Sequence, residues 1–137
     1  MTGQSRAASV LLIGESVDER EMYGEALRLE GFCTLQAASV SAAGRMVDEL
    51  RPSAVVLSEG RLDDGVGVSA IRRLARHTAA AGLPVVVLTS HACPADVEAA
   101  RIAGCDQVIV KPCSPDVLIK RLGELINPIG AATGQTS

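Results

Sequence analysis

Five short apolar runs, each followed by a stretch with helical periodicity, constrain the fold of this chain more than any other feature. The predicted strands are Ser9–Ile13, Phe32–Ala37, Ala54–Ser58, Pro84–Thr89 and Gln107–Val110. Uninterrupted β-branched runs bounded by turn residues are typical of strands buried on both faces. Strands that alternate with helices indicate a parallel sheet with helices on both sides.

Capping residues and glycines indicate where the expected helices begin and end. We expect helices at about 19–30, from Ser39 or Ser41 to 51, from Gly67 or Ser69 to 77, at 95–103 and at 115–126. In the first helix, Met22, Leu27 and Leu29 are expected on the apolar side. The segment Thr78–Gly82 is expected to be a small-residue link. Right-handed crossovers then favour a flavodoxin-like, doubly wound (βα)5 fold with a five-stranded parallel sheet in the order 2-1-3-4-5.

The length of 137 residues indicates one domain. We assign residues 1–8 to a flexible N-terminus, 9–127 to the domain and 128–137 to a flexible tail. The only aromatic side chains are Tyr23 and Phe32, so small aliphatic residues must build the core. A net charge of -3 argues against a nucleic-acid partner, which would require clustered basic residues.

The cysteines and the apolar segments indicate a cytoplasmic chain with no membrane partner. None of Cys33, Cys93, Cys105 and Cys113 forms a C-x-x-C pair. The first residues lack a signal-peptide pattern. No apolar run reaches the roughly 20 residues of a membrane span.

Polar residues follow four of the predicted strands. They are Gly14-Glu15, Ser58-Glu59, Thr89 and Lys111-Pro112. In an open α/β sheet the ligand crevice lies at the carboxyl ends of the strands, so these residues are expected on one edge. Carboxylates hold a hard cation, while an ammonium and a hydroxyl receive phosphate oxygens. The set therefore favours a site for a phosphoryl group.

Five segments together carry a resemblance to a known family. They are 10–18, Arg61–Gly67, Leu88–His91, Ala103–Asp106 and Lys111–Asp116. With them, about residues 9–126 resemble the receiver domains of two-component response regulators. The resemblance implies that Thr89 and Lys111 fill the family's hydroxyl and lysine positions, and that Pro112 follows a cis peptide bond.

The chain departs from the family at the acidic positions. Receivers carry two adjacent acidic residues after the first strand, whereas this chain has Gly14-Glu15. Receivers carry a phosphoacceptor Asp at the end of the third strand. Alignment on Arg61 and Gly67 places Glu59 there, and alignment on Pro52 places Ser58 there instead. We favour Glu59 and keep Ser58 as the alternative register.

These departures predict a receiver that aspartyl phosphorylation does not control. Only Glu15 and Glu59 remain as Mg²⁺ ligands, so the metal site is expected to be weak or lost, and no other cofactor is expected. The Glu59 carboxylate is expected to reach toward Thr89 and Lys111 as a permanent, weaker imitation of phosphorylation. The family's aromatic switch position holds Val108, so the switch between two packings should be muted.

The resemblance implies a signalling role without catalytic residues or enzyme activity. The implied partners are a histidine kinase, a phosphotransfer protein or an effector. They would bind a surface formed by 96–102, 108–110 and 116–121, through which a homodimer is also conceivable. One alternative is a conventional phosphorylatable single-domain response regulator. Another is a small flavodoxin-like cofactor-binding protein, which the lack of aromatics near the edge argues against.

Three further patterns have simpler interpretations. The segment Gly65–Ala70 matches G-x-G-x-x-A, but it starts several residues after its strand and lacks a following acidic partner. His91, Cys93 and Cys113 share the carboxyl edge, where small polar loop residues and inert thiols explain them better than a metal site. Glu59 itself could be an ordinary strand-end carboxylate paired with Lys111.

Overall fold

The sheet has the predicted order and direction. A computed structural model describes residues 8–60, 62 and 66–126. The strands are β1 (Ser9–Ile13), β2 (Cys33–Ala37), β3 (Ala54–Glu59), β4 (Val85–Thr89) and β5 (Gln107–Val110). All neighbouring pairs are parallel, in the order β2-β1-β3-β4-β5. The flavodoxin-like, doubly wound prediction is therefore confirmed.

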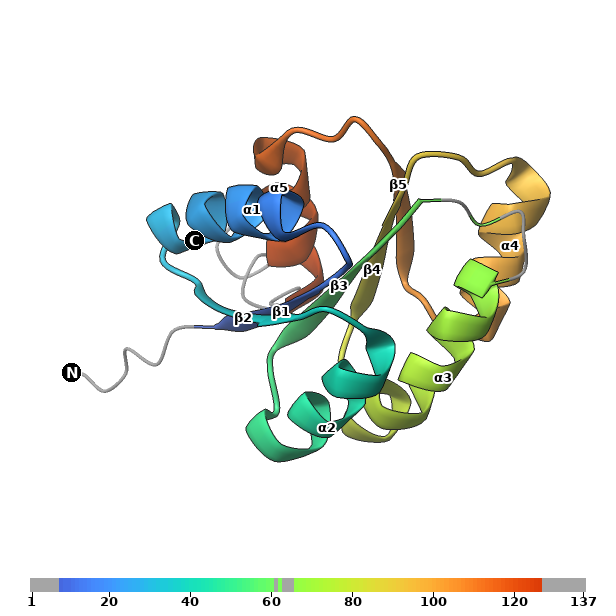
Figure 1. Ribbon diagram of the computed structural model, residues 1–137, viewed down its shortest axis with the longest axis horizontal. Coiled ribbons are helices and arrows are strands. Elements are labelled where there is room, and N and C mark those ends of the chain that lie inside the picture. The colour runs from blue at the N-terminus through green and yellow to red at the C-terminus, as the bar shows by residue number, and fades with distance from the viewer. Residues whose placement is uncertain (1–7, 61, 63–65, 127–137) are drawn as a thin grey trace, which may run out of the picture.

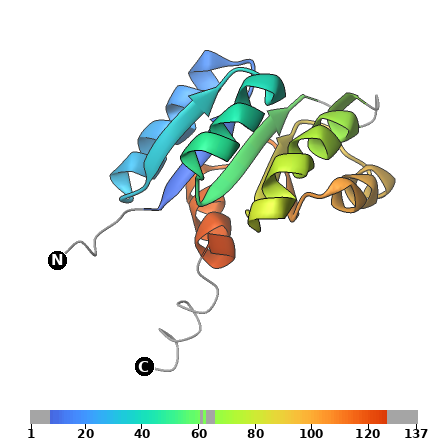
Figure 2. The same ribbon diagram turned by 90° about the horizontal axis from the view of Figure 1, so that it is seen from below.

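Helices cover both faces of this sheet. They are α1 (Val17–Leu29), α2 (Val40–Leu50), α3 (Val66–Ala81), α4 (Pro94–Ala103) and α5 (Pro115–Ile126). Figure 1 shows α1 and α5 on one face and α2, α3 and α4 on the other. Figure 2 shows the second group of helices from below, in front of the sheet. Among the described residues, no helix combines the length and the apolar character needed to cross a bilayer.

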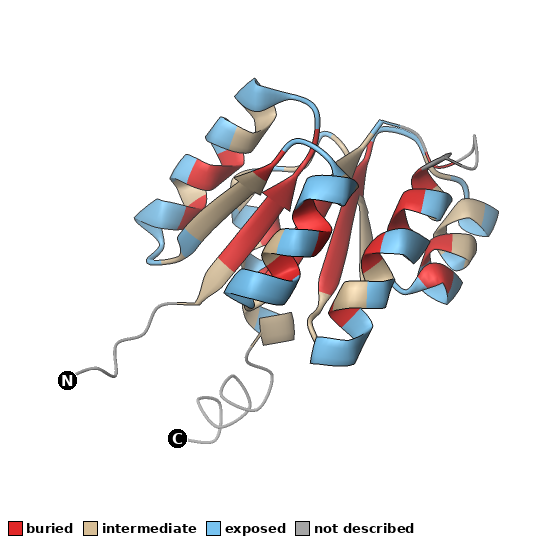
Figure 3. Ribbon diagram, turned by 60° about the horizontal axis from the view of Figure 1, so that its bottom comes forward, coloured by how far each residue is buried: buried red, intermediate tan, exposed pale blue. Residues whose placement is uncertain are grey.

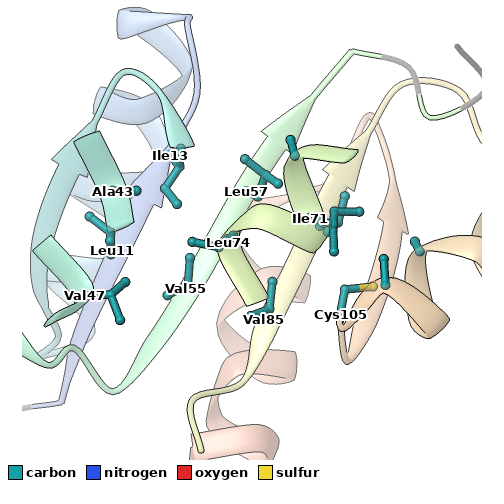
Figure 4. Close-up of a cluster of buried hydrophobic side chains, with 14 of the residues drawn as sticks. Leu11, Ile13, Ala43, Val47, Val55, Leu57, Ile71, Leu74, Val85 and Cys105 are labelled. Carbon is teal, nitrogen blue, oxygen red and sulfur yellow. The ribbon is translucent and has the colours of Figure 1, made fainter. Parts of the chain in front are cut away.

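Alternate residues of each strand supply two separate cores. Leu11, Val55 and Leu57 pack with α2, α3 and α4 (Figure 4). Val10 and Val56 pack with Tyr23 and Leu27 of α1 and with α5. The central strands β1, β3 and β4 are buried except at Ser9, Ser58 and Glu59, while each helix keeps an exposed outer side (Figure 3). Each fully buried aliphatic side chain contributes about 1.5–3 kcal/mol relative to exposure.

Side-chain caps begin the two helices nearest the carboxyl edge of β1 and β2. The Ser16 hydroxyl accepts the Glu19 N–H at 3.1 Å, and the Ser39 hydroxyl accepts the Ala42 N–H at 3.2 Å. These bonds satisfy amide groups that have no partner within the helix. Gly104 ends α4 with a φ of 127°, where a Cβ would approach the Ala75 Cβ to 2.7 Å. A glycine is therefore required at that position.

Two expectations about the helices were wrong. Residues 78–81 are not a link, because α3 continues through them to Ala81. Alanine is the strongest helix former, and the Thr78 hydroxyl lies 3.5 Å from the Leu74 carbonyl of its own helix. In α1, Met22 and Leu29 are exposed, and Tyr23 is buried with Leu27 instead. Flexible ends were assigned to residues 1–8 and 128–137, and all of these except Ala8 lie outside the described residues.

Candidate functional site

Strand register brings five of the predicted residues to one edge of the sheet. Ile13 pairs with Leu57, so Gly14 lies beside Ser58. Glu59 pairs with Thr89, and Thr89 pairs with Val110, the residue before Lys111. The Lys111 N–H also donates to the Thr89 carbonyl at 2.7 Å. The Lys111–Pro112 peptide bond is cis, as the resemblance implied.

Lys111 is the centre of a polar cluster at this edge. Its Nζ atom lies 2.7 Å from Ser58 Oγ and 3.0 Å from Glu19 Oε2. The Ser58 hydroxyl donates to Glu19 Oε1. We call Glu19, Ser58 and Lys111 the rim cluster. The side chains of Lys111 and Glu19 are 20% and 23% exposed, so water screens their attraction only in part.

The backbone directs Ser58, rather than Glu59, toward this cluster. Successive side chains of a strand point to opposite faces. Val56 packs in the core beneath α1 and α5, so Ser58 lies on that same face, where α1 supplies Glu19. Leu57 packs in the core on the opposite face of the sheet, and Glu59, two residues further along the strand, lies on that opposite face as well. Of the two register candidates, Ser58 is therefore the one that contacts Lys111.

Glu19 is a site residue that the sequence reasoning missed. It lies three residues after Ser16, a spacing typical of a reciprocal cap at a helix N-terminus. That spacing predicts a local role, whereas the carboxylate actually reaches β3 and the loop after β5. Its position in the first turn of α1 also lets the helix dipole stabilise its charge. No sequence signal links residue 19 to residue 111.

Gly14 and Glu15 stand where receivers carry their acidic pair. Gly14 donates its N–H to the Ala37 carbonyl at 3.1 Å and accepts a hydrogen bond from the Arg20 guanidinium. The Arg20 Nε atom also donates to Gln36 Oε1 at 3.0 Å, which fixes the guanidinium beside this loop. Glu15 is exposed. The loop therefore presents one solvated carboxylate and one fixed cation.

These residues do not fit a resident Mg²⁺ ion. Gly14 offers no side-chain ligand, and Glu19 is already engaged by Lys111. Across residues 8–60, 62 and 66–126, no three His, Cys, Asp or Glu side chains are grouped as metal ligands. Mg²⁺ requires near-octahedral oxygen coordination, and the expected ligands Glu15 and Glu59 are not joined by a third acidic side chain among the described residues. The same finding gives no support to a metal site at His91, Cys93 and Cys113.

Thr89 joins two loops instead of the rim cluster. It is fully buried, and its hydroxyl lies 3.3 Å from the Gly60 carbonyl and 3.2 Å from the His91 carbonyl. Ser90 donates to the same Gly60 carbonyl through its N–H and its hydroxyl. The loop after β3 is thereby tied to the loop after β4. Val108, at the family's switch position, lies in β5, pairs with Val87 of β4 and packs against the core beneath α3 and α4.

A cavity of about 560 Å³ opens beside the rim cluster. Its floor is apolar, from Ile13, Leu57 and Ala70, and its walls include Ser39 and Arg73. The cavity lies between the ends of β1 and β3, where the strand order reverses direction. Open α/β sheets bind their ligands at this kind of position.

Tyr23 is a second residue that the sequence reasoning missed. Its hydroxyl donates to the Cys113 carbonyl at 2.6 Å. Burial raises the pKa of Tyr23 to about 12, and the nearby Cys113 and Glu19 side chains act in the same direction. Because the hydroxyl has a carbonyl partner, the buried phenol carries no unsatisfied donor.

The fold and the rim cluster define a flavodoxin-like domain whose site is built around one lysine. A family model described as the response regulator receiver domain matches residues 10–123. The chain therefore belongs to the response regulator receiver domain family. Receiver domains are signalling modules, and this match favours that class over the small cofactor-binding alternative.

Relatives support the same assignment. The phosphate regulon transcriptional regulatory protein PhoB of Pseudomonas aeruginosa is 26% identical over 122 residues, covering 89% of this chain and 53% of that protein. The probable transcriptional regulatory protein TcrX of Mycobacterium tuberculosis is 32% identical over 125 residues, covering 91% of this chain and 52% of that protein. This chain thus spans about half the length of these relatives.

Solved structures share the fold. The chemotaxis protein CheY4 of Vibrio cholerae superposes with a TM-score of 0.75 at 21% identity, covering 88% of this chain and 99% of that chain. A response regulator protein of Burkholderia multivorans gives a TM-score of 0.69 at 27% identity, covering 88% of this chain and 95% of that chain. The similarity to CheY4, at 21% identity, concerns the fold alone.

Proposed function

We propose that this receiver domain signals through protein–protein contacts in a conformation that aspartyl phosphorylation does not set. The observation that supports this proposal is the contact of Lys111 Nζ with Ser58 Oγ and Glu19 Oε2, at 2.7 and 3.0 Å. In the proposal, Ser58 stands at the acceptor position, in place of the initially favoured Glu59. A serine hydroxyl cannot form the acyl phosphate that an aspartate forms.

Glu19 supplies the permanent negative charge in this proposal. Its carboxylate carries one charge, compared with about -1.5 to -2 for a phosphoryl group at neutral pH. The charge sits on α1, whereas the family's acceptor sits on β3. In the proposal, the charge of Lys111 is consequently balanced from α1, whether or not a partner kinase is active.

Exposed apolar residues support a role for α4, β5 and α5 in output. Ile102, Val110 and Val117 are 77%, 50% and 43% exposed, and they come from these three elements in turn. Exposed apolar side chains mark protein–protein contacts when they form a contiguous patch, whereas single ones are common on any protein surface. In the proposal, this surface binds a kinase, a phosphotransfer protein, an effector or a second copy of the domain.

Intact-mass measurement tests the proposal. The chain is incubated with acetyl phosphate and Mg²⁺, next to a receiver that retains its acceptor aspartate. We expect a phosphoryl adduct on the control receiver and none on this chain. A stoichiometric adduct that hydroxylamine removes would contradict the proposal, because acyl phosphates react with hydroxylamine.

One observation favours a second candidate, phosphorylation of Ser58 itself. The Ser58 hydroxyl donates to a carboxylate and accepts from an ammonium, which resembles a hydroxyl held between a general base and a phosphate-binding cation. The mass experiment separates this candidate from the first. An adduct that survives both acid and hydroxylamine, and disappears in Ser58→Ala, would indicate phosphoserine.

A further inference from the structure

Helix α1 contacts the loop between β5 and α5 through two polar side chains. The Glu19 carboxylate forms an ion pair with Lys111 Nζ, with 3.0 Å between Nζ and Oε2. The Tyr23 hydroxyl donates to the Cys113 carbonyl at 2.6 Å. The two partners lie immediately on either side of Pro112 in the chain. One helix thus holds both sides of a short loop.

Helical geometry places the two α1 side chains on one side of the helix. Residues four apart lie one above the other, so Glu19 and Tyr23 face the same neighbour. Figure 1 shows α5, which continues from this loop, on the same face of the sheet as α1. The Tyr23 ring is 4% exposed and packs among Leu27, Leu118 and Leu122. The hydroxyl is therefore presented from an immobilised ring.

We propose that Tyr23 is a positioning residue for the rim cluster. Its bond to the Cys113 carbonyl fixes the loop so that Lys111 Nζ stays within reach of Glu19 and Ser58. The inference deepens the proposed function, and it rests on that function only for the importance of the cluster.

The energetics explain why such a residue is needed. Ordering a lysine side chain costs up to about 2 kcal/mol of rotamer entropy. The Lys111–Glu19 pair, whose side chains are 20% and 23% exposed, returns only about 1 kcal/mol, so a loosely held loop would let the lysine leave. The Lys111 N–H is fixed to the Thr89 carbonyl on one side of the loop. Tyr23 supplies the restraint on the other side.

The two lysines of the chain provide a direct test. Lys111 is partly buried in the cluster, while Lys120 is exposed on α5. Brief labelling with an amine-acetylating reagent, followed by peptide mass spectrometry, gives the ratio of their labelling rates. We expect Tyr23→Phe to raise the Lys111/Lys120 ratio by roughly two- to tenfold, the factor that corresponds to one lost neutral hydrogen bond.

A matched control separates positioning from general loosening. Thr78→Val removes another buried hydroxyl, on α3 in the opposite layer, without touching the rim cluster. We expect it to leave the labelling ratio unchanged. An unchanged ratio in a folded Tyr23→Phe chain, or an equal rise in Thr78→Val, would overturn the proposal.

A second experiment keeps Tyr23 in place, so it tests the proposal even if the Tyr23→Phe chain does not fold. The chain has one tyrosine and no tryptophan, so its fluorescence reports Tyr23 alone. We expect Glu19→Gln to change the emission intensity, because the loop relaxes and the hydroxyl bond lengthens. Glu25→Gln, at an exposed position of the same helix, should not change it. Equal intensities in Glu19→Gln and the unmodified chain would reject the coupling.

Failure of this inference is distinguishable from failure of the proposed function. Neither the labelling ratio nor the emission depends on a phosphodonor. A chain that acquires aspartyl-type phosphate could still show the Tyr23 effect, and a chain that stays unmodified could lack it.

Discussion

A Cβ atom built on Gly14 would lie 3.2 Å from the Cβ atom of Ser58. This separation is tighter than ordinary van der Waals contact, and the Ser58 side chain is fixed by its bonds to Lys111 and Glu19. A larger side chain at the end of β1 would therefore require Ser58 to shift by a few tenths of an ångström. The acidic residue that receivers carry at this place would meet the same close contact with Ser58.

Gly14→Ala should consequently destabilise the domain. We expect the free energy of unfolding to fall by about 1 kcal/mol or more, the usual cost of overpacking a tight site. Urea unfolding followed by circular dichroism measures the change. Gly123→Ala is the control, because a Cβ at that position of α5 meets nothing within 4 Å. There the substitution should stabilise the helix by about 0.5–1 kcal/mol.

The attraction between Glu19 and Lys111 should be measurable as a coupling energy. A cycle of Glu19→Gln, Lys111→Met and the double variant should give about 1 kcal/mol, since both side chains are mostly shielded from solvent. The coupling should shrink as salt is added. A coupling energy near zero at low salt would show that the contact contributes nothing to stability.

Thr89→Val should loosen the connection between the loops after β3 and β4. The substitution keeps the shape of the side chain but removes the hydroxyl that faces the Gly60 and His91 carbonyls. We expect a loss of about 1 kcal/mol and faster amide exchange at Leu62 and Ser90, whose N–H groups bridge these loops. Exchange at Ala43, in the far core, should change only by the global loss in stability.

Alkaline pH should weaken the fold through Tyr23. Its pKa is raised from 10.0 to about 12, mainly by burial, so the folded state favours the neutral phenol. This contribution is complete below pH 10 and is lost as the pH rises through about 12. It should amount to at most about 3 kcal/mol. Cys105, whose pKa burial raises to about 11, acts in the same direction.

Ultraviolet absorbance of tyrosinate and unfolding curves at rising pH measure this effect. Tyr23→Phe removes the tyrosine contribution and leaves that of Cys105. The difference between the two pH profiles isolates Tyr23. Tyrosine ionisation at pH 10 in the folded chain would contradict the prediction.

Backbone patterns predicted the framework of this domain well. The five apolar runs identified the strands and their parallel direction, because uninterrupted β-branched segments suit buried parallel strands. Right-handed crossovers then favoured the order 2-1-3-4-5. Lys111 was identified from its place after the last strand. The small side chains at 78–81 were mistaken for a link, since a run of alanines has no amphipathic pattern although it favours a helix.

The contacts within the site could not be predicted in the same way. The choice between Ser58 and Glu59 depends on a single residue of strand register, which reverses the face of every side chain. The contacts of Glu19 and Tyr23 depend on how α1 is rotated against β3 and the loop after β5. Tyr23 was overlooked because Met22 and Leu29 appeared to supply the buried side of the helix, and both are exposed.

The Lys111–Glu19 pair has a consequence for how information could pass through this domain. A charge that is covalently part of the chain is present from synthesis until degradation, so it has no lifetime of its own. A cell that relied on such a domain would change the signal by making or destroying copies of it. Transcription and proteolysis would then govern a response that, in a reversible relay, is governed by the balance of two opposing reactions.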